Sequence, residues 1–430
     1  MSLVQTFFCG MYTDLPATNA THYNRLAAHG GTWSATAGNR EQVIPTPGTF
    51  TNLRVELDAA PGTSKSRTGQ LYKNGVAQGT GVVISDAATS GTQTEELSLA
   101  AGDVVEFRMI ASGSPAAAQC YWAWDWIPDT DQEGIQISGN VNSLSTTATV
   151  YNVIGPSNQA GWTATYANFL TICPTAGTWS DLFIDLSAAP GSGKSFAFTV
   201  LKNGVATALT TTVSDTATTA SDTSNSFTCI KGDEITIRCV PSGTPASGIT
   251  ASHGTVFVSD TADESLHLGR GTNAMSTTAT EYNNLGSASS VWSTDPSFFR
   301  ALAWDGSDGT LLKKFMVKLN GAPAFAGSSY TFSPAIGAGD PPTASALTVT
   351  IAEGATTGED FSNTVTVAQG DIITMMKTVS ATAPASRVAF WGLVQVNIAT
   401  ASGGVVRRIA GEGGLAGMGG IAGLHGGLAG

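Results

Sequence analysis

Charged side chains are scarce in this sequence. Asp, Glu, Lys and Arg make up 12% of the 430 residues, against roughly 25% in an average globular protein. The net charge is −12, and the cationic side chains are scattered, with Arg407-Arg408 as their densest pair. Phosphate binding needs clustered Lys and Arg. The composition therefore argues against a nucleic-acid partner.

Long apolar runs are also missing. No stretch approaches the ~18 uninterrupted apolar residues of a membrane span, so we expect no membrane partner. The first twenty residues lack the basic and apolar regions of a secretory signal, and we expect synthesis in the cytoplasm without export.

Cysteine is limited to five residues in no metal-binding spacing: Cys9, Cys120, Cys173, Cys229 and Cys239. We interpret them as buried thiols of a chain made in a reducing compartment. A disulfide between Cys229 and Cys239, across a tight hairpin at Gly232-Asp233, is the alternative.

What the sequence has instead is a repeat of about 130 residues, present three times. The copies share six landmarks: Tyr23-Asn24, Tyr151-Asn152 and Tyr282-Asn283; Trp33, Trp162 and Trp292; Gly48-Thr49, Gly177-Thr178 and Gly309-Thr310; Pro61, Pro190 and Pro323; Gly102-Asp103, Gly232-Asp233 and Gly370-Asp371; Pro115, Pro245 and Pro384. The first two copies also share Asn74-Gly75 and Asn203-Gly204. A period of this length is a whole domain, not a solenoid unit.

Alternation of apolar and polar residues inside each copy is typical of half-buried strands. Residues 182–186 and 195–200 alternate in this way around a Pro-Gly turn, and Asn203-Gly204 is the signal of a type I′ hairpin. Helical periodicity is absent. The sequence predicts an all-β protein of three tandem jelly-roll-like antiparallel β-sandwiches, residues 1–132, 135–262 and 265–398, followed by a glycine-rich tail at 399–430.

The run SLAAGDVVEFRMI resembles a late-strand segment of jelly rolls of the C1q and tumour-necrosis-factor type. The cassette GTWSDLFIDLSAAPGSGKSFAFTVLKNGVATALTTTVSD, starting at Gly177, resembles repeats in structural proteins of tailed bacteriophages. The resemblance covers about 390 of the 430 residues. It implies a virion component, such as a capsid decoration, head fibre or tail fibre, that self-associates, often as a trimer, alongside other virion proteins.

The tail spaces its larger side chains every three residues: Ile409, Leu415, Met418, Ile421 and Leu424. A period of three matches a polyproline-II-type helix, and glycine faces would let several such chains bundle. We expect an assembly device. A flexible glycine-rich linker is the alternative.

Candidate sites for chemistry are weak in this sequence. Gly191-Ser192-Gly193-Lys194-Ser195 imitates a phosphate-binding loop but has Ala188 where that motif needs glycine, and residues 129–134 imitate an incomplete calcium loop. The histidines show no metal-ligand spacing. We expect no catalytic residue, no metal, no cofactor and no enzymatic activity.

The best candidate for ligand contact is the aromatic run at 121–126. Trp122, Trp124 and Trp126 share one face of a strand, and aromatic faces stack on sugar rings. Trp124 and Trp126 are particular to the first copy, and two interpretations stay open for them: a core or domain interface, or a glycan platform. The leading hypothesis is therefore a non-enzymatic structural protein of a phage virion, and the alternative is an adhesin that binds host surface glycans.

Overall fold

The computed structural model describes residues 3–27, 32–38, 40–139, 142–157, 161–271, 273–289, 291–299, 301–302, 309–337, 342–368 and 370–397. Apart from two short 3-10 helices, η1 (Tyr166–Asn168) and η2 (Pro296–Phe299), the regular structure of these residues is β-strand. The all-β prediction is thereby confirmed. No helix in the described part is long and apolar enough to span a membrane.

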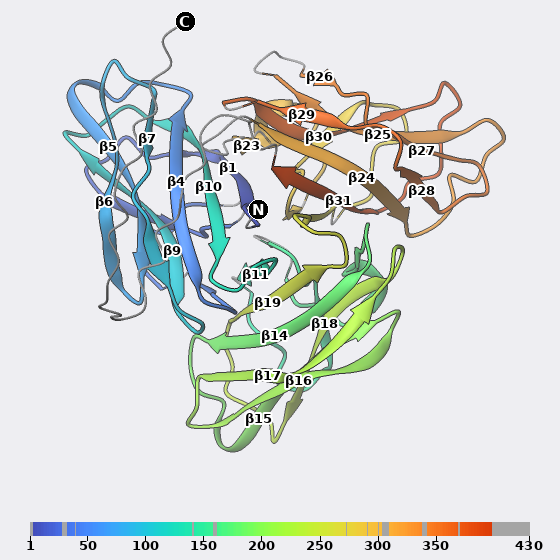
Figure 1. Cartoon of the computed structure of the whole chain (residues 1–430), viewed down its shortest axis with the longest axis horizontal. Helices are drawn as coiled ribbons and strands as arrows, with labels where there is room; N and C mark the ends of the chain where they lie inside the picture. Colours follow the sequence, from blue (N-terminus) through green and yellow to red (C-terminus); the bar gives the residue numbers. More distant parts are fainter. Residues whose placement is uncertain are drawn as a thin grey trace, which may run out of the picture. The chain divides into compact units, whose positions relative to one another are not determined.

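The strands form six sheets, two in each of three successive segments of the chain. In the first segment, β1 to β10 (blue to teal in Figure 1), one sheet has the order β1-β10-β4-β7 with β8 also on β4, and the other has the order β2-β9-β5-β6 with β3 also on β9. The strands are β1 (Gln5–Leu15), β2 (Thr21–Asn24), β3 (Gln42–Val43), β4 (Gly48–Leu57), β5 (Gly62–Lys73), β6 (Val76–Asp86), β7 (Ser90–Gln93), β8 (Leu97–Leu99), β9 (Val104–Ser112) and β10 (Ala118–Pro128).

The second segment, β11 to β19, repeats this plan. Its sheets have the orders β11-β19-β14-β17 and β12-β18-β15-β16, with β13 also on β18. The strands are β11 (Gly134–Gly139), β12 (Val150–Asn152), β13 (Thr171–Ile172), β14 (Gly177–Leu186), β15 (Gly191–Lys202), β16 (Val205–Asp215), β17 (Thr219–Cys229), β18 (Glu234–Ser242) and β19 (Ala251–Ser259).

The third segment, β20 to β31, follows the plan with additions. Its sheets have the orders β22-β20-β31-β24-β28, with β29 also on β24, and β21-β30-β25-β26, with β23 also on β30 and β27 on β25. The strands are β20 (Ser265–Gly271), β21 (Glu281–Asn283), β22 (Ala288–Ser289), β23 (Ala301–Leu302), β24 (Thr310–Leu319), β25 (Ser329–Ile336), β26 (Thr343–Ala344), β27 (Val349–Ala352), β28 (Thr357–Asp360), β29 (Val365–Val367), β30 (Ile372–Val379) and β31 (Ala389–Asn397).

Each segment buries its own apolar core between its two sheets. In the first segment, Val55 on β4 and Phe107 on β9 belong to one buried cluster, although their strands lie in different sheets. Comparable clusters fill the second and third segments. The paired antiparallel sheets are therefore consistent with β-sandwiches. The residues from Met1 to Ala399 nevertheless form one compact unit, so the segments also pack against one another.

The Asn-Gly hairpins explain why two of the repeated landmarks occur together. Asn203 and Gly204 have φ angles of 52° and 79°, as a type I′ turn requires. The Asn203 amide donates to Asp233 Oδ1 at 2.7 Å and accepts from the Glu234 N–H at 2.8 Å. Asn74 makes the same pair of bonds, to Asp103 and from Val104. The Asn-Gly and Gly-Asp turns thus form one hydrogen-bonded tip.

A bulge interrupts the central strand of each segment, which alternation in the sequence did not indicate. Asn52, Asp181 and Lys314 occupy it with φ angles of 53°, 54° and 51°. The register with the neighbouring strand shifts at this point in β4, β14 and β24 alike. Bulges bend a strand and increase its twist, so the three central strands bend at corresponding positions.

The disulfide alternative is not met. All five cysteines are free thiols and buried, and Cys229 on β17 and Cys239 on β18 lie in different sheets. Burial raises the pKa of the Cys239 thiol. The interpretation of the cysteines as buried apolar side chains therefore holds.

Replacement of Asn203 tests the tip. Asn203→Ala removes both side-chain hydrogen bonds and places a Cβ-bearing residue without a local hydrogen bond at positive φ, so we expect it to lower the free energy of unfolding by about 1–2 kcal/mol. Asn203→Gly keeps the backbone relaxed and should cost less. Denaturant titration of both variants measures this, and an Ala variant as stable as the parent would contradict the role of the tip.

Candidate functional site at the junctions between segments

The predicted glycan platform lies inside the first segment. Trp124 and Trp126 on β10 are both 0% exposed. The Trp124 ring stacks on Phe7 at 4.3 Å and on Phe50 at 5.1 Å between ring centroids, and its indole N–H donates to the Leu26 carbonyl. Sugar stacking needs an exposed ring face. The platform interpretation is therefore corrected to a core role, because β10 is a central strand covered on both faces.

The predicted assembly residues Ile409, Leu415, Met418, Ile421 and Leu424 lie outside the described residues. In the part of the chain that the structure describes, no three His, Cys, Asp or Glu side chains gather as ligands for a metal ion. Several buried polar groups instead lie where one segment meets the next.

A short strand of each segment packs on the next segment in the same way. β3 packs against β11, β14 and β19; β13 packs against β20, β24 and β31; β23 packs against β1 and β10. The receiving strand carries a small residue at the contact. A side chain at Gly254 would collide with the Val43 carbonyl, and one at Gly392 with the Ile172 carbonyl. Ala123 takes the corresponding place on β10, in a buried cluster with Leu302.

The Gly-Asp turns make a second recurring contact. Each turn lies on the bent central strand of the following segment, beside the residue two positions after the bulge. A Cβ placed on the turn glycine would stand 3.8 Å from Phe183 for Gly102, 3.6 Å from Met316 for Gly232 and 3.7 Å from Arg54 for Gly370. The third of these contacts joins the third segment to the first.

The first strand of each segment completes the core of the segment before it. Ile135 and Ile137 of β11 belong to the core of the first segment, and Leu266 and Leu268 of β20 belong to the core of the second. Phe8 of β1 belongs in turn to the core of the third segment. Neither the alternation of these strands nor their landmarks indicated which segment would bury them.

Side-chain amides bind the main chain of these first strands. Gln5 donates to the Ile135 carbonyl at 3.0 Å, and Gln136 donates to the Leu266 carbonyl at 3.0 Å. Gln395 makes the corresponding bonds to Thr6: its amide nitrogen donates to the Thr6 carbonyl at 3.1 Å, and its oxygen accepts from the Thr6 N–H at 3.0 Å. Buried main-chain groups at all three junctions are thereby paired.

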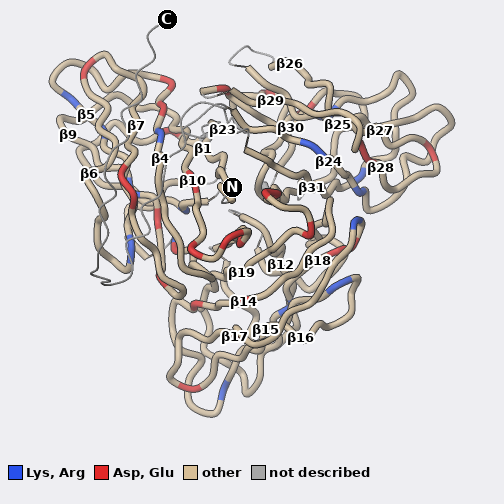
Figure 2. The backbone as a smooth tube through the Cα atoms, viewed as in Figure 1, with Lys and Arg blue, Asp and Glu red and all other residues tan. Residues whose placement is uncertain are grey.

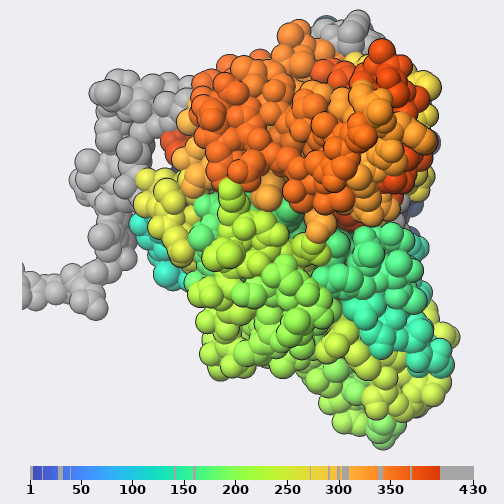
Figure 3. All heavy atoms as spheres, turned by 90° about the vertical axis from the view of Figure 1, so that its right-hand side faces the viewer, coloured from blue at the N-terminus to red at the C-terminus, as the bar shows by residue number. Residues whose placement is uncertain are grey.

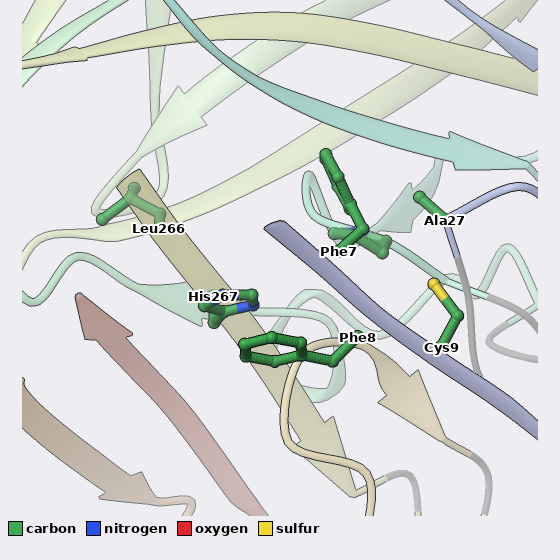
Figure 4. Close-up of a pocket in the computed structure, with 8 residues that line it drawn as sticks. Phe7, Phe8, Cys9, Ala27, Leu266 and His267 are labelled. Atoms are coloured by element: carbon green, nitrogen blue, oxygen red, sulfur yellow. The ribbon is translucent and has the colours of Figure 1, made fainter. Parts of the chain in front are cut away.

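Figure 4 shows the junction of the third segment with the first. The Phe8 ring stacks on the His267 imidazole, with centroids 4.8 Å apart and planes 7° apart. His267 Nε2 lies 2.7 Å from the Gln395 side-chain amide, and the amide orientation that bonds the Thr6 carbonyl also directs its nitrogen at this ring nitrogen. Burial lowers the pKa of His267 to about 4, so the ring is neutral near pH 7. A small pocket beside it is lined by residues of all three segments, including Cys9, Pro156 and Gly286.

The second junction carries additional charged contacts. Lys231 of the second segment pairs with Glu359 of the third at 2.9 Å, and Lys318 of the third pairs with Glu234 of the second. Arg270, fully buried on β20, lies 3.9 Å over the Phe169 ring, and burial lowers its pKa to about 9. Figure 2 shows Lys and Arg gathered at this junction, and Figure 3 shows the second and third segments (green and orange) in direct contact.

The first junction has a polar pocket where the second has an apolar cluster. Its lining includes Glu41, Asp185 and Ser252. Strand register shows that Ser252 at the first junction corresponds to Phe390 at the second. Ser252 pairs with Asp185 and Gly139, and Phe390 pairs with Lys318 and Arg270. Phe390 clusters with Leu170 and Val388. The two junctions therefore share a backbone plan and differ in chemistry.

Both carboxyl groups of this pocket are hard to ionise. Burial, together with the negative charges of Glu106 and Asp185, raises the pKa of Glu41 to about 7. Burial alone raises the pKa of Asp185 to about 6. The pocket links the contact of the first two segments to pH.

No protein-family model matches the chain, and no curated protein matches it.

The pocket predicts a pH dependence of stability. A raised carboxyl pKa in the folded state means that folding favours the protonated form, so these two groups contribute most below about pH 4 and their contribution is lost as pH rises to about 7. Glu41→Gln should remove its share, leaving melting temperatures that fall less between pH 5 and pH 7.5, by on the order of a few degrees. The difference between variant and parent is the measurement, because the other titrating groups cancel in it. A constant difference across this range would contradict the assignment.

Trp124 tests the corrected core role. Trp124→Ala should lower the free energy of unfolding by about 3–5 kcal/mol, the usual loss for a fully buried large aromatic, as measured by denaturant titration. A loss below about 1 kcal/mol, the range of exposed positions, would indicate an accessible ring and reopen the glycan interpretation. Val76→Ala, at an exposed hairpin position, is the control with little expected effect.

Proposed function

We propose that this protein is a non-enzymatic structural component of a phage virion, built from three tandem jelly-roll-type sandwiches and a glycine-rich assembly tail. The proposal rests on one observation: the repeated landmark residues make contacts that hold the fold together. The Asn-Gly and Gly-Asp turns bind each other, and the Gly-Asp turns then contact the next segment. The repeated sequence thus serves folding and packing of the segments.

The buried ionisable groups support the same role. His253 and His267 are held neutral by burial, with pKa values lowered to about 4. One ring nitrogen of each is hydrogen-bonded, in His253 to the Val153 carbonyl and in His267 to Gln395. General acid–base catalysis needs a pKa near the working pH and access to substrate. Neither histidine meets both conditions.

The phage assignment rests on the resemblance of the cassette that starts at Gly177 to repeats in structural proteins of tailed bacteriophages. A virion component of this kind works with other virion proteins, and the glycine-rich tail with its regularly spaced apolar residues is the segment we assign to such contacts. We assign the tail, with Ile409, Leu415, Met418, Ile421 and Leu424, to binding further copies or other particle proteins. The adhesin alternative assigned glycan binding to Trp124 and Trp126, and both side chains are buried.

Deletion of residues 405–430 tests the proposal. The truncated chain should keep the circular dichroism spectrum and melting temperature of the full chain, because Met1 to Ala399 form a separate compact unit. It should lose the assemblies that the full chain forms in analytical ultracentrifugation and electron microscopy. Replacing Leu415, Met418, Ile421 and Leu424 by Ser, at constant length, is the matched control for the apolar spacing. Unchanged assembly of the truncated chain would contradict the proposed role.

A further inference from the structure

We propose that the three segments close into a ring within a single chain, so that one copy of the protein supplies all three subunits of a threefold assembly. The faces through which its segments associate then have their partners in the same molecule. This inference stands on the contacts between segments and is independent of the phage assignment.

The first step is that three contacts recur at three junctions. The short strand of one segment meets a small residue of the next, the turn glycine meets the bent central strand of the next, and the first strand of the next segment enters the core of the one before. Each holds from the first segment to the second and from the second to the third. Each also holds from the third segment to the first, through Leu302 on Ala123, Gly370 on Arg54 and Phe8 in the third core.

The second step concerns the kind of interface. Each segment uses one face to contact the following segment and a different face to receive the preceding one, which is a head-to-tail interface. Such an interface gives an open filament unless its rotation closes. Here the contact of the third segment with the first closes it after three. Within the described residues, each of the three recurring contacts is made at all three junctions of the ring.

The third step concerns the closing junction. Short connectors, residues 128–134 and 259–265, join the segments at the first two junctions. The closing junction has no connector and depends on non-covalent contacts. These include the Thr6 main-chain bonds to Gln395, the stack of Phe8 on His267 and the apolar cluster of Tyr121, Ala123, Leu302 and Ile372. This junction is therefore the one that two separate copies could form with each other, and the one to test.

The consequence is a restriction on partners. A second copy of this chain cannot add to the body through the recurring faces without opening a ring. Higher assemblies must therefore use other surfaces, such as the tail, and a trimer of chains would be a trimer of closed rings.

Cross-linking in the full-length chain tests the closure. In Gly370→Cys with Arg54→Cys, a short bismaleimide should join the two thiols within one chain. The product should run as a single chain in denaturing electrophoresis, and mass spectrometry should identify the cross-linked peptide pair. The matched control is Gly102→Cys with Phe183→Cys, the same contact at the first junction, where the glycine has the same φ of 86°. The unsubstituted chain controls for its five native thiols, which are buried.

Three outcomes decide the inference. Single-chain products from both pairs support it. Products of two or three chains from the Gly370/Arg54 pair would overturn it, because the closing contact would then form between copies. A Gly370/Arg54 pair that fails to react while the control pair reacts would overturn it as well, because the ring would be open. Melting curves compared with the parent show whether each variant has folded, and Gly232→Cys with Met316→Cys replaces the control pair if that variant has not.

Discussion

The structure depends on close approach of main chain between neighbouring segments. At Gly254 and Gly392 a carbonyl of the preceding segment, that of Val43 or Ile172, comes so near that no Cβ would fit. On the corresponding strand of the first segment, Ala123 lies in a buried cluster with Leu302. Interfaces packed at this distance are rigid, because a displacement of even one methyl group forces a shift of the surrounding atoms. The recurring strands, turns and bulges place this contact at the same position each time.

Much of the fold could be predicted from the sequence because the signals are local. The alternation at 182–186 and 195–200 and the Asn-Gly pairs predicted strands and type I′ hairpins, and both are present. The sequence did not predict the bulges. Asn52 and Asp181 are residue types that adopt positive φ, but Lys314 is not, so the three positions share no sequence signal. The junctions were missed for a different reason. Small residues such as Ala123 and Gly392 carry no periodic pattern, and alternation tells that Ile135 and Ile137 share a face without telling which segment will cover it.

The tryptophans of β10 show another limit of prediction from sequence. Trp122, Trp124 and Trp126 share one face of β10, as predicted, but a strand pattern does not say whether that face meets solvent or core. Phe7, from a strand more than a hundred residues away, covers Trp124. Burial of this kind depends on tertiary contacts, which a local strand pattern does not specify. The tail residues from Ile409 to Leu424 lie outside the described residues, and their role stays a prediction.

The junctions share their backbone plan and differ in chemistry. The first carries Glu41 and Asp185, the second carries the Lys231 and Lys318 ion pairs with buried Arg270, and the closing one carries the neutral His267 stack. Differences of this kind stabilise one cyclic order of segments over others, since each face fits its own neighbour best. Small-angle X-ray scattering of residues 1–399 at single-chain mass tests the closed body most directly. A closed ring predicts a radius of gyration close to the ~21 Å of one compact domain of that length, and a much larger value with an elongated distance distribution would contradict it.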